Sequence, residues 1–269
     1  MIRQPAVAGR FYPAQPEQLL EQLEIFAPAD VSTVPVPALG CVVPHAGYKY
    51  SGHVAGAVYS RLELPAKYIL LCPQHYRVGE PMAIMSDGVW RTPLGDASID
   101  SVLAVALKRA CPELREDSSE HKVEHALEVQ LPFLQRLAGN FTFVPIALGT
   151  DRLTQFEALG MAIAEAIAAQ TEPVLVVASS DMNHYEPDDV TRKKDQRAIE
   201  KILALDATGL YEVVRREGIT MCGYGPTVTM LTAAKQLGAT KAELVRYATS
   251  GDITGDPSEV VGYAGIIVQ

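Results

Sequence analysis

Short apolar runs alternate with segments of helical periodicity along most of the chain. The apolar runs are rich in Val, Ile and Leu, which predicts strands buried on both faces. Such strands are expected from Cys41, over 67–74 and 141–148, from Val174, and in two closing runs over 243–249 and 260–268. The periodic segments predict helices over 17–23, 52–62, 99–110, 119–137, 153–169, 188–205, 207–216 and 226–237.

Strands that alternate with helices are typical of an α/β fold with a largely parallel sheet. We therefore expect a three-layer α/β/α sandwich with a mostly parallel, mixed central sheet, in which the two closing strands form an antiparallel edge pair. Neither a low-complexity linker nor a repeat of fixed period divides the sequence. A single domain over residues 1–269 is expected.

Composition and charge exclude several classes of partner. The chain is 48% hydrophobic and 20% charged, as in soluble globular proteins, and its net charge of −9 comes without a Lys/Arg block, so no nucleic-acid partner is expected. No apolar stretch is long enough to span a membrane, and the first ten residues lack the apolar core of a secretory signal. Four cysteines without C-x-x-C spacing, at 41, 72, 111 and 222, favour reduced thiols in a cytoplasmic protein.

Three of the apolar runs end in a histidine, at His45, His75 and His184. Ligands of open α/β sheets bind beyond the carboxyl ends of the strands, so these histidines should converge on one sheet edge. A single histidine more commonly caps a helix or bonds a loop carbonyl, but three in this position favour a metal or acid–base site. Imidazole suits Zn, Fe, Cu or Ni, and two histidines need a further anionic or sulfur ligand.

Two neighbouring side chains extend this site. Asp181 shares a loop with His184 and is expected to orient its imidazole; alternatively it caps the turn and His184 is a surface residue. Cys222 precedes a predicted helix, whose N-terminus would lower the thiol pKa and favour a nucleophile or a soft metal ligand. The competing interpretation is a small buried hydrophobe, the commoner fate of one cysteine.

A second pattern is H-x-x-E-H at residues 121–125. On a helix, His121 and His125 would share a face, as a zinc peptidase requires. With only three fixed positions the pattern has low specificity, and a charged helical surface explains it equally well. The chain has no Walker A sequence, no G-x-G-x-x-G after a strand and no G-x-S-x-G, so neither a nucleotide cofactor nor serine-hydrolase chemistry is expected.

Taken in order, the motifs resemble the Memo family, also called AmmeMemoRadiSam system protein B. The matching segments are residues 3–13, 44–52, 73–75, 124–133, 179–185 and 222–223. The resemblance implies a fold like that of the class III extradiol (LigB-type) dioxygenases. It also implies that His45 and His75 match two metal ligands, that Cys222 stands where those dioxygenases have a glutamate, and that His184 matches their additional histidine beside Asp181.

A thiolate in place of a carboxylate makes the ligand set softer, so ring-opening dioxygenase activity is not expected. The resemblance implies iron or copper as the metal, with zinc also compatible, and a redox role. It further implies a radical-SAM protein and an AmmeMemo-domain protein as pathway partners. His125, Glu128 and Gln130 belong to one of the matching segments and are expected to line or buttress the pocket.

Three hypotheses follow. The first is a metal-dependent redox enzyme or metal-binding protein that uses His45, His75 and Cys222 as ligands, with His184 as an acid–base group oriented by Asp181. The second is a non-catalytic module that binds a peptide or protein through a vestigial site. The third, ranked last, is the H-x-x-E-H zinc peptidase.

Overall fold

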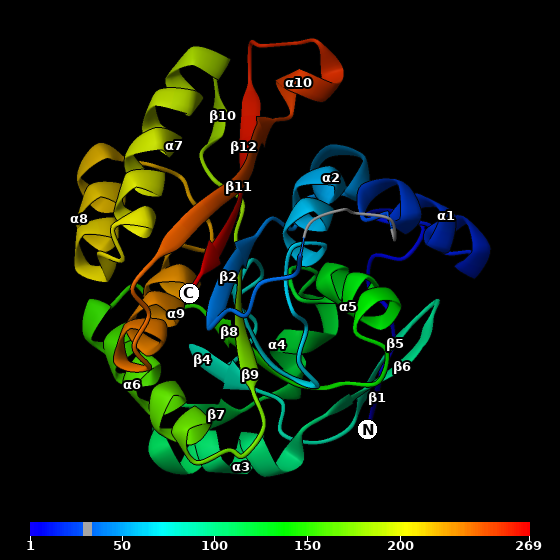
Figure 1. Cartoon of the computed structure of the whole chain (residues 1–269), viewed down its shortest axis with the longest axis vertical. Coiled ribbons are helices and arrows are strands. Elements are labelled where there is room, and N and C mark those ends of the chain that lie inside the picture. Colours follow the sequence, from blue (N-terminus) through cyan, green and yellow to red (C-terminus); the bar gives the residue numbers. More distant parts are fainter. Residues whose placement is uncertain (29–33) are drawn as a thin grey trace.

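A mixed twelve-stranded sheet forms the centre of the computed structural model, which describes residues 1–28 and 34–269 (Figure 1). Its strands are β1 Ile2–Arg3, β2 Gly40–Val43, β3 Lys67–Pro73, β4 Met82–Ile84, β5 Val89–Thr92, β6 Gly95–Ile99, β7 Arg115–Glu116, β8 Thr142–Leu148, β9 Val174–Ser179, β10 His184–Glu186, β11 Ala242–Thr249 and β12 Val260–Val268.

Helices follow most of these strands in the chain. They are α1 Pro16–Phe26, α2 Tyr48–Tyr59, α3 Ser101–Ala110, α4 Ser118–Val123, the 3-10 turn η1 Glu128–Gln130, α5 Leu131–Leu137, α6 Leu153–Ala168, α7 Asp188–Leu203, α8 Ala207–Glu217, α9 Tyr224–Gln236 and α10 Gly251–Thr254. Within the described residues, none of the helices has the length and apolar character needed to cross a bilayer.

The middle of the sheet is parallel. Strands β8, β3, β9 and β2 lie side by side in that order, and Ile69 of β3 is opposite Val144 on one side and Val176 on the other. The closing strands β11 and β12 are antiparallel to each other, as expected. However, β12 is not at an edge, because it also pairs with β2 and β10.

Helices cover both faces of this sheet. Successive strand residues point to opposite faces, so Ile69 and Leu71 pack in one hydrophobic core with residues of α3, α6 and α9, while Tyr68 and Leu70 pack in a second core with residues of α1, α2 and α5. Figure 1 shows these two groups of helices on either side of the strands. The predicted three-layer α/β/α architecture is confirmed.

The helix predicted over 119–137 is wrong in its middle. Helix α4 ends at Val123, Glu124 has an extended backbone (φ −68°, ψ 125°), and α5 begins only at Leu131. The break is stabilised from outside the segment, because the guanidinium of Arg3 donates to the carbonyl oxygens of His121 (2.7 Å) and Glu124 (2.7 Å). Pro132 then suits the first turn of a new helix, where no backbone N–H is needed.

Glu128 fastens the N-terminal segment to this break. Its buried carboxylate accepts hydrogen bonds from the backbone N–H groups of Ala6 (2.7 Å) and Val7 (3.0 Å) and from the Tyr12 hydroxyl (2.6 Å), and it forms an ion pair with Arg3. The expected buttressing role of Glu128 is thus directed at the segment that precedes α1, and not at the pocket itself.

Candidate metal centre

A cleft opens where three adjacent parallel strands end. Strands β2, β9 and β3 finish at Val43, Ser179 and Pro73, and the chain then turns away from the sheet. The cleft has a volume of about 630 Å³ and is lined by Phe11, His45, Ala46, Gly47, His75, His125, Asp181, His184, Tyr185, Thr220, Cys222, Val261 and Tyr263. All five predicted site residues lie on it, and their individual roles stay predictions.

The hydrogen bonds around His45 determine which of its ring nitrogens carries the proton. Its Nδ1 lies 2.9 Å from Oγ of Ser179, whose hydroxyl donates to the Ala126 carbonyl (2.7 Å) and accepts from Nε2 of Gln130 (3.0 Å). Because the serine proton is already used, Nδ1 of His45 must be the donor. Burial, reinforced by the neighbouring histidines, lowers the pKa of His45. The ring is therefore neutral and presents the Nε2 lone pair to the cleft.

His75 is held in the same way by Glu124. The Glu124 carboxylate accepts from Nδ1 of His75 (2.9 Å) and from the backbone N–H of His75 (2.8 Å). Burial by itself lowers the pKa of His75, but the hydrogen bond and charge of Glu124 outweigh it and raise the pKa. Burial alone would raise the pKa of Glu124, but the hydrogen bonds and charge interaction with His75 outweigh burial, and the net effect is a lowered pKa. An ionised carboxylate can only accept, which leaves Nε2 of His75 facing the cleft.

His184 is oriented by Thr220, and not by Asp181 as predicted. Its Nδ1 donates to the Thr220 carbonyl (3.0 Å), and its backbone N–H donates to the Thr220 hydroxyl (2.7 Å). Asn183 fixes Thr220 in turn, since its Oδ1 accepts from the Thr220 backbone N–H (3.0 Å). Asp181 instead accepts from the backbone N–H of His45 (2.8 Å), and its other oxygen lies 4.0 Å from Nε2 of His45.

Cys222 lies against His45. Its Sγ is 3.2 Å from Nε2 of His45 and accepts from the backbone N–H of Asp181 (3.3 Å). Two donors at about 2.05 and 2.3 Å from one ion are separated by roughly 3.1 Å at a right angle and roughly 3.6 Å at the tetrahedral angle. The observed separation is within this range, so the pair is spaced to share an ion.

The expected low thiol pKa of Cys222 is wrong for the metal-free protein. Helix α9 begins two residues later, at Tyr224, but burial raises the pKa of Cys222 and the charge of Asp181 raises it further. The group is therefore a thiol until an ion displaces its proton, which is the usual linkage between metal binding and proton release.

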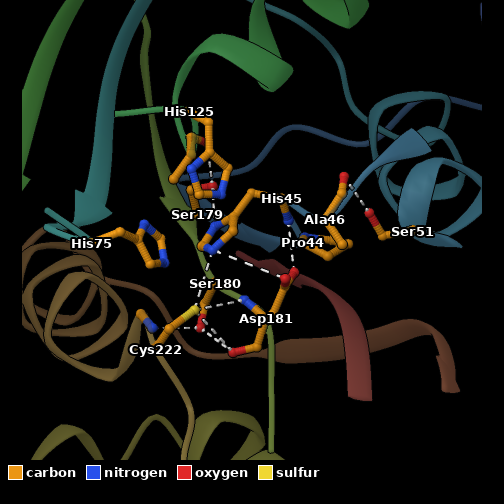
Figure 2. A network of polar contacts seen from close by, with 12 residues as sticks. Pro44, His45, Ala46, Ser51, His75, His125, Ser179, Ser180, Asp181 and Cys222 are labelled. Atoms are coloured by element: carbon orange, nitrogen blue, oxygen red, sulfur yellow. Dashed lines mark hydrogen bonds and ion pairs between the residues drawn. The ribbon is translucent and has the colours of Figure 1, made fainter. Parts of the chain in front are cut away.

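His125 lies beside His45 and His75, although the sequence predicted it only as pocket lining or as a zinc ligand paired with His121. Ring nitrogens of His45, His75 and His125 all lie within 4.8 Å of one another, and Figure 2 shows the three rings gathered together. Burial lowers the pKa of His125 to about 4, so its ring is neutral. The position of His125 depends on the helix break at Glu124. The strand-end pattern that placed His45 and His75 in the cleft therefore could not place His125 there.

The same break separates the two histidines of H-x-x-E-H. His121 is on α4 and buried, with its ring 5.6 Å from that of Trp90, whereas His125 follows the helix and faces the cleft. The shared helical face that the zinc-peptidase interpretation needs does not exist, and that interpretation is wrong on this geometry.

The donors of the cleft suit a transition metal. Metal-binding histidines commonly donate their other ring N–H to a carboxylate, a carbonyl or another oxygen, which fixes the tautomer and the ring orientation. His45, His75 and His184 each have this arrangement. Imidazole nitrogens with an adjacent thiol form a donor set that iron, copper and zinc all accept.

Comparisons with known proteins agree with the resemblance found in the sequence. A family model described as Memo-like protein matches residues 3–267. A MEMO1 family protein of Methanopyrus kandleri is 44% identical and is aligned over 100% of this chain and 99% of its own length. One of Methanosarcina barkeri is also 44% identical, with complete coverage of both chains.

One solved structure shares the fold alone. An uncharacterized protein of Escherichia coli K12 has a TM-score of 0.57 at 11% sequence identity, and the match covers 85% of this chain and 98% of that one.

Proposed function

This chain belongs to the Memo-like protein family, and from that membership and the geometry of its cleft we propose that it binds a metal ion through His45, His75 and Cys222. The ion is iron or copper, with zinc as a compatible third choice. The observation that carries the proposal is the 3.2 Å separation between Nε2 of His45 and Sγ of Cys222, on an imidazole whose other nitrogen is already tied to Ser179.

We further propose a redox role. A bound iron or copper ion would supply one-electron chemistry in the cleft. The residues around it would do the rest: with its Nδ1–H committed to the Thr220 carbonyl, His184 directs its Nε2 toward the cleft. It is therefore set to accept a proton from a molecule bound in the cleft. Phe11, Val261 and Tyr263 supply an apolar wall that would exclude water from that molecule.

The test of metal binding is elemental mass spectrometry on protein purified anaerobically without an affinity tag. Wild type is compared with His45→Ala and His75→Ala, and His53→Ala is the control, since His53 lies on α2 and is not part of the cleft lining. Near-stoichiometric metal in wild type and His53→Ala, lost in the other two, is the expected result. Full metal content in His45→Ala and His75→Ala would refute the proposal.

A second function, recognition of a peptide or protein at the mouth of the cleft, is favoured by Tyr185. Its side chain is 72% exposed, and its backbone holds φ +58°, a conformation that costs energy for a residue with a side chain. If a partner is captured through this surface, Tyr185→Ala should abolish capture while His45→Ala and His75→Ala leave it intact. The radical-SAM and AmmeMemo-domain proteins implied by the family are the partners to test, with the cytoplasm as the expected compartment.

A further inference from the structure

Two different donors lie beside the pair His45 and His75. Figure 2 shows Cys222 and His125 on opposite sides of the His45 ring, with His75 to one side. Cys222 is next to Nε2 of His45 (3.2 Å), whereas the His125 ring is closer to His75 (4.7 Å between centroids) than to His45 (5.5 Å). The group of nitrogens within 4.8 Å of one another contains the three histidines and does not include Cys222.

The side chains of Cys222 and His125 differ in the hydrogen bonds that hold them. Sγ of Cys222 is fixed by the backbone N–H of Asp181 at 3.3 Å, just before α9. Nδ1 of His125 is buried and makes no hydrogen bond within the described residues, although it lies 3.4 Å from the Glu124 carboxylate. Within the described residues no hydrogen bond holds Nδ1 of His125, in contrast to His45 and His75. Its ring neighbours are Phe11 and His75, each at 4.7 Å, and His45 at 5.5 Å.

The two donors also differ in chemistry. A thiolate is soft and anionic and favours ions such as Cu(I), while imidazole is neutral and suits Ni(II) and other borderline ions. Three imidazole nitrogens up to 4.8 Å apart must move closer to reach one ion, since nitrogens at about 2.05 Å from a tetrahedral ion are roughly 3.3 Å apart. Of the three imidazoles, His125 is the one whose Nδ1 makes no hydrogen bond within the described residues, so its ring can reorient toward an ion without breaking one there.

We infer that the cleft offers an ion two overlapping ligand sets that share His45 and His75, with Cys222 completing the set for a soft ion and His125 completing it for a nitrogen-preferring ion. This inference rests on the proposed metal binding and adds to it a selection between ions by softness. It assigns His125 a role as a ligand. Glu124 then lies beside both imidazoles, since it accepts a hydrogen bond from His75 and is adjacent to Nδ1 of His125.

The test measures the affinity of metal-free protein for Cu(I) and for Ni(II), by anaerobic competition with chelators of known strength. Cys222→Ala removes the thiol, and His125→Phe removes the imidazole while keeping a ring against Phe11. The control variant is His53→Asn. If thermal unfolding shows that Cys222→Ala or His125→Phe is misfolded, Cys222→Ser or His125→Asn takes its place. In wild type, the Ni(II) complex should lack a thiolate-to-nickel charge-transfer band.

Loss of an outer-shell partner typically lowers metal affinity by about 10- to 100-fold. Loss of a ligand should lower the affinity by at least as much. Cys222→Ala should weaken Cu(I) binding by this factor and change Ni(II) binding little, and His125→Phe should do the reverse. If both variants weaken both ions, the cleft has one four-donor set and the inference is overturned. If His125→Phe weakens neither ion, His125 is not a ligand, and the inference fails while the proposed function stands. Wild type that binds neither ion would overturn this inference, whereas the proposed function is tested separately by the iron, copper and zinc content of the purified protein.

Discussion

Nε2 of His45 and Sγ of Cys222 lie 3.2 Å apart, although 177 residues separate them in the chain. Neither residue reaches this position through its own neighbours: His45 follows β2, and Cys222 precedes α9. The contact is made because β2 and β9 are paired, and the turn after β9 passes beneath the thiol, where the Asp181 backbone N–H meets Sγ. Substitutions in this framework should therefore alter the distance between His45 and Cys222.

Gly223→Ala is expected to displace Cys222. A methyl group at Gly223 would lie 2.4 Å from the Ser179 carbonyl oxygen and 2.4 Å from Cβ of Ser180, so the backbone beside Cys222 must shift. Overpacking of this kind costs about 1–3 kcal/mol of stability, and the displaced thiol should weaken Cu(I) binding. Gly47→Ala is the control, because Gly47 lines the cleft and a methyl group there would meet nothing nearer than 3.6 Å. Unchanged Cu(I) affinity in Gly223→Ala would contradict this account.

Glu124→Gln is expected to lower the pKa of His75. The hydrogen bond and negative charge of Glu124 outweigh burial and raise that pKa, so burial should prevail once the charge is gone. The variant is also expected to lose about 1–3 kcal/mol, because the amide cannot accept both His75 N–H groups. An NMR titration of the histidine C–H signals measures the shift, with the distant His53 signal as the internal control. An unaltered His75 titration would show that Glu124 does not set its protonation.

The buried ion pair between Arg3 and Glu128 should show strong coupling. Arg3→Met leaves the Glu128 carboxylate buried without its cation, and such changes cost about 3–5 kcal/mol. The double variant Arg3→Met with Glu128→Gln leaves no unpaired charge, so it should lose less than the sum of the two single losses. Chemical denaturation measures all three, and Arg91→Met, which breaks an exposed pair with Asp96, is the control and should change stability far less. Strictly additive losses would show that the pair is not coupled.

Asp195 should make the protein less stable as the pH rises toward neutrality. Burial raises the pKa of this carboxyl to about 7, although Tyr247 and the Asn183 backbone donate to it. In the unfolded chain the pKa is about 3.9, so between about pH 4 and 7 the folded state binds more protons and stability falls as the pH rises. The cost is fully present above the folded pKa and absent below the unfolded one.

Asp195→Asn removes this titration while keeping an oxygen for the Asn183 N–H. The variant should match wild type near pH 4 and exceed it at pH 8 by a few kcal/mol, since one pKa unit corresponds to about 1.4 kcal/mol. The measurement is the difference in unfolding free energy between the two proteins across this range, which cancels the other titrating groups. A difference that does not grow with pH would contradict the prediction.

The parts of the fold that were predictable depend on local pattern. The runs that became β3, β8 and β9 are apolar at nearly every position because both faces are covered, and this pattern is visible without any knowledge of partners. The placement of His45 and His75 at strand ends followed from the same runs. The place of Cys222 before a helix made it a candidate ligand, and the family motifs aligned it with the dioxygenase glutamate, but its distance in sequence gives no spacing from which to infer its contact with His45.

The parts that were not predictable depend on contacts between distant segments. Residues 124–127 have helical periodicity, and they leave the helix because Arg3, more than a hundred residues earlier, takes the carbonyl oxygens of His121 and Glu124. The position of His125 is a consequence of that break. In the same way, the carbonyl that orients His184 belongs to Thr220, and a backbone carbonyl has no signature in sequence, whereas the carboxylate of Asp181 nearby offered a plausible but wrong candidate.

The interior position of β12 has a consequence for biosynthesis. This strand follows every other described strand in the sequence and is synthesised after them, yet it pairs with β2. Until it emerges, the nascent chain carries an open sheet edge beside the strand that precedes His45, and the cleft lacks the wall that Val261 and Tyr263 provide. The cleft is therefore complete only after β12 has been synthesised, and a protein truncated before Val260 should be both unstable and unable to bind an ion.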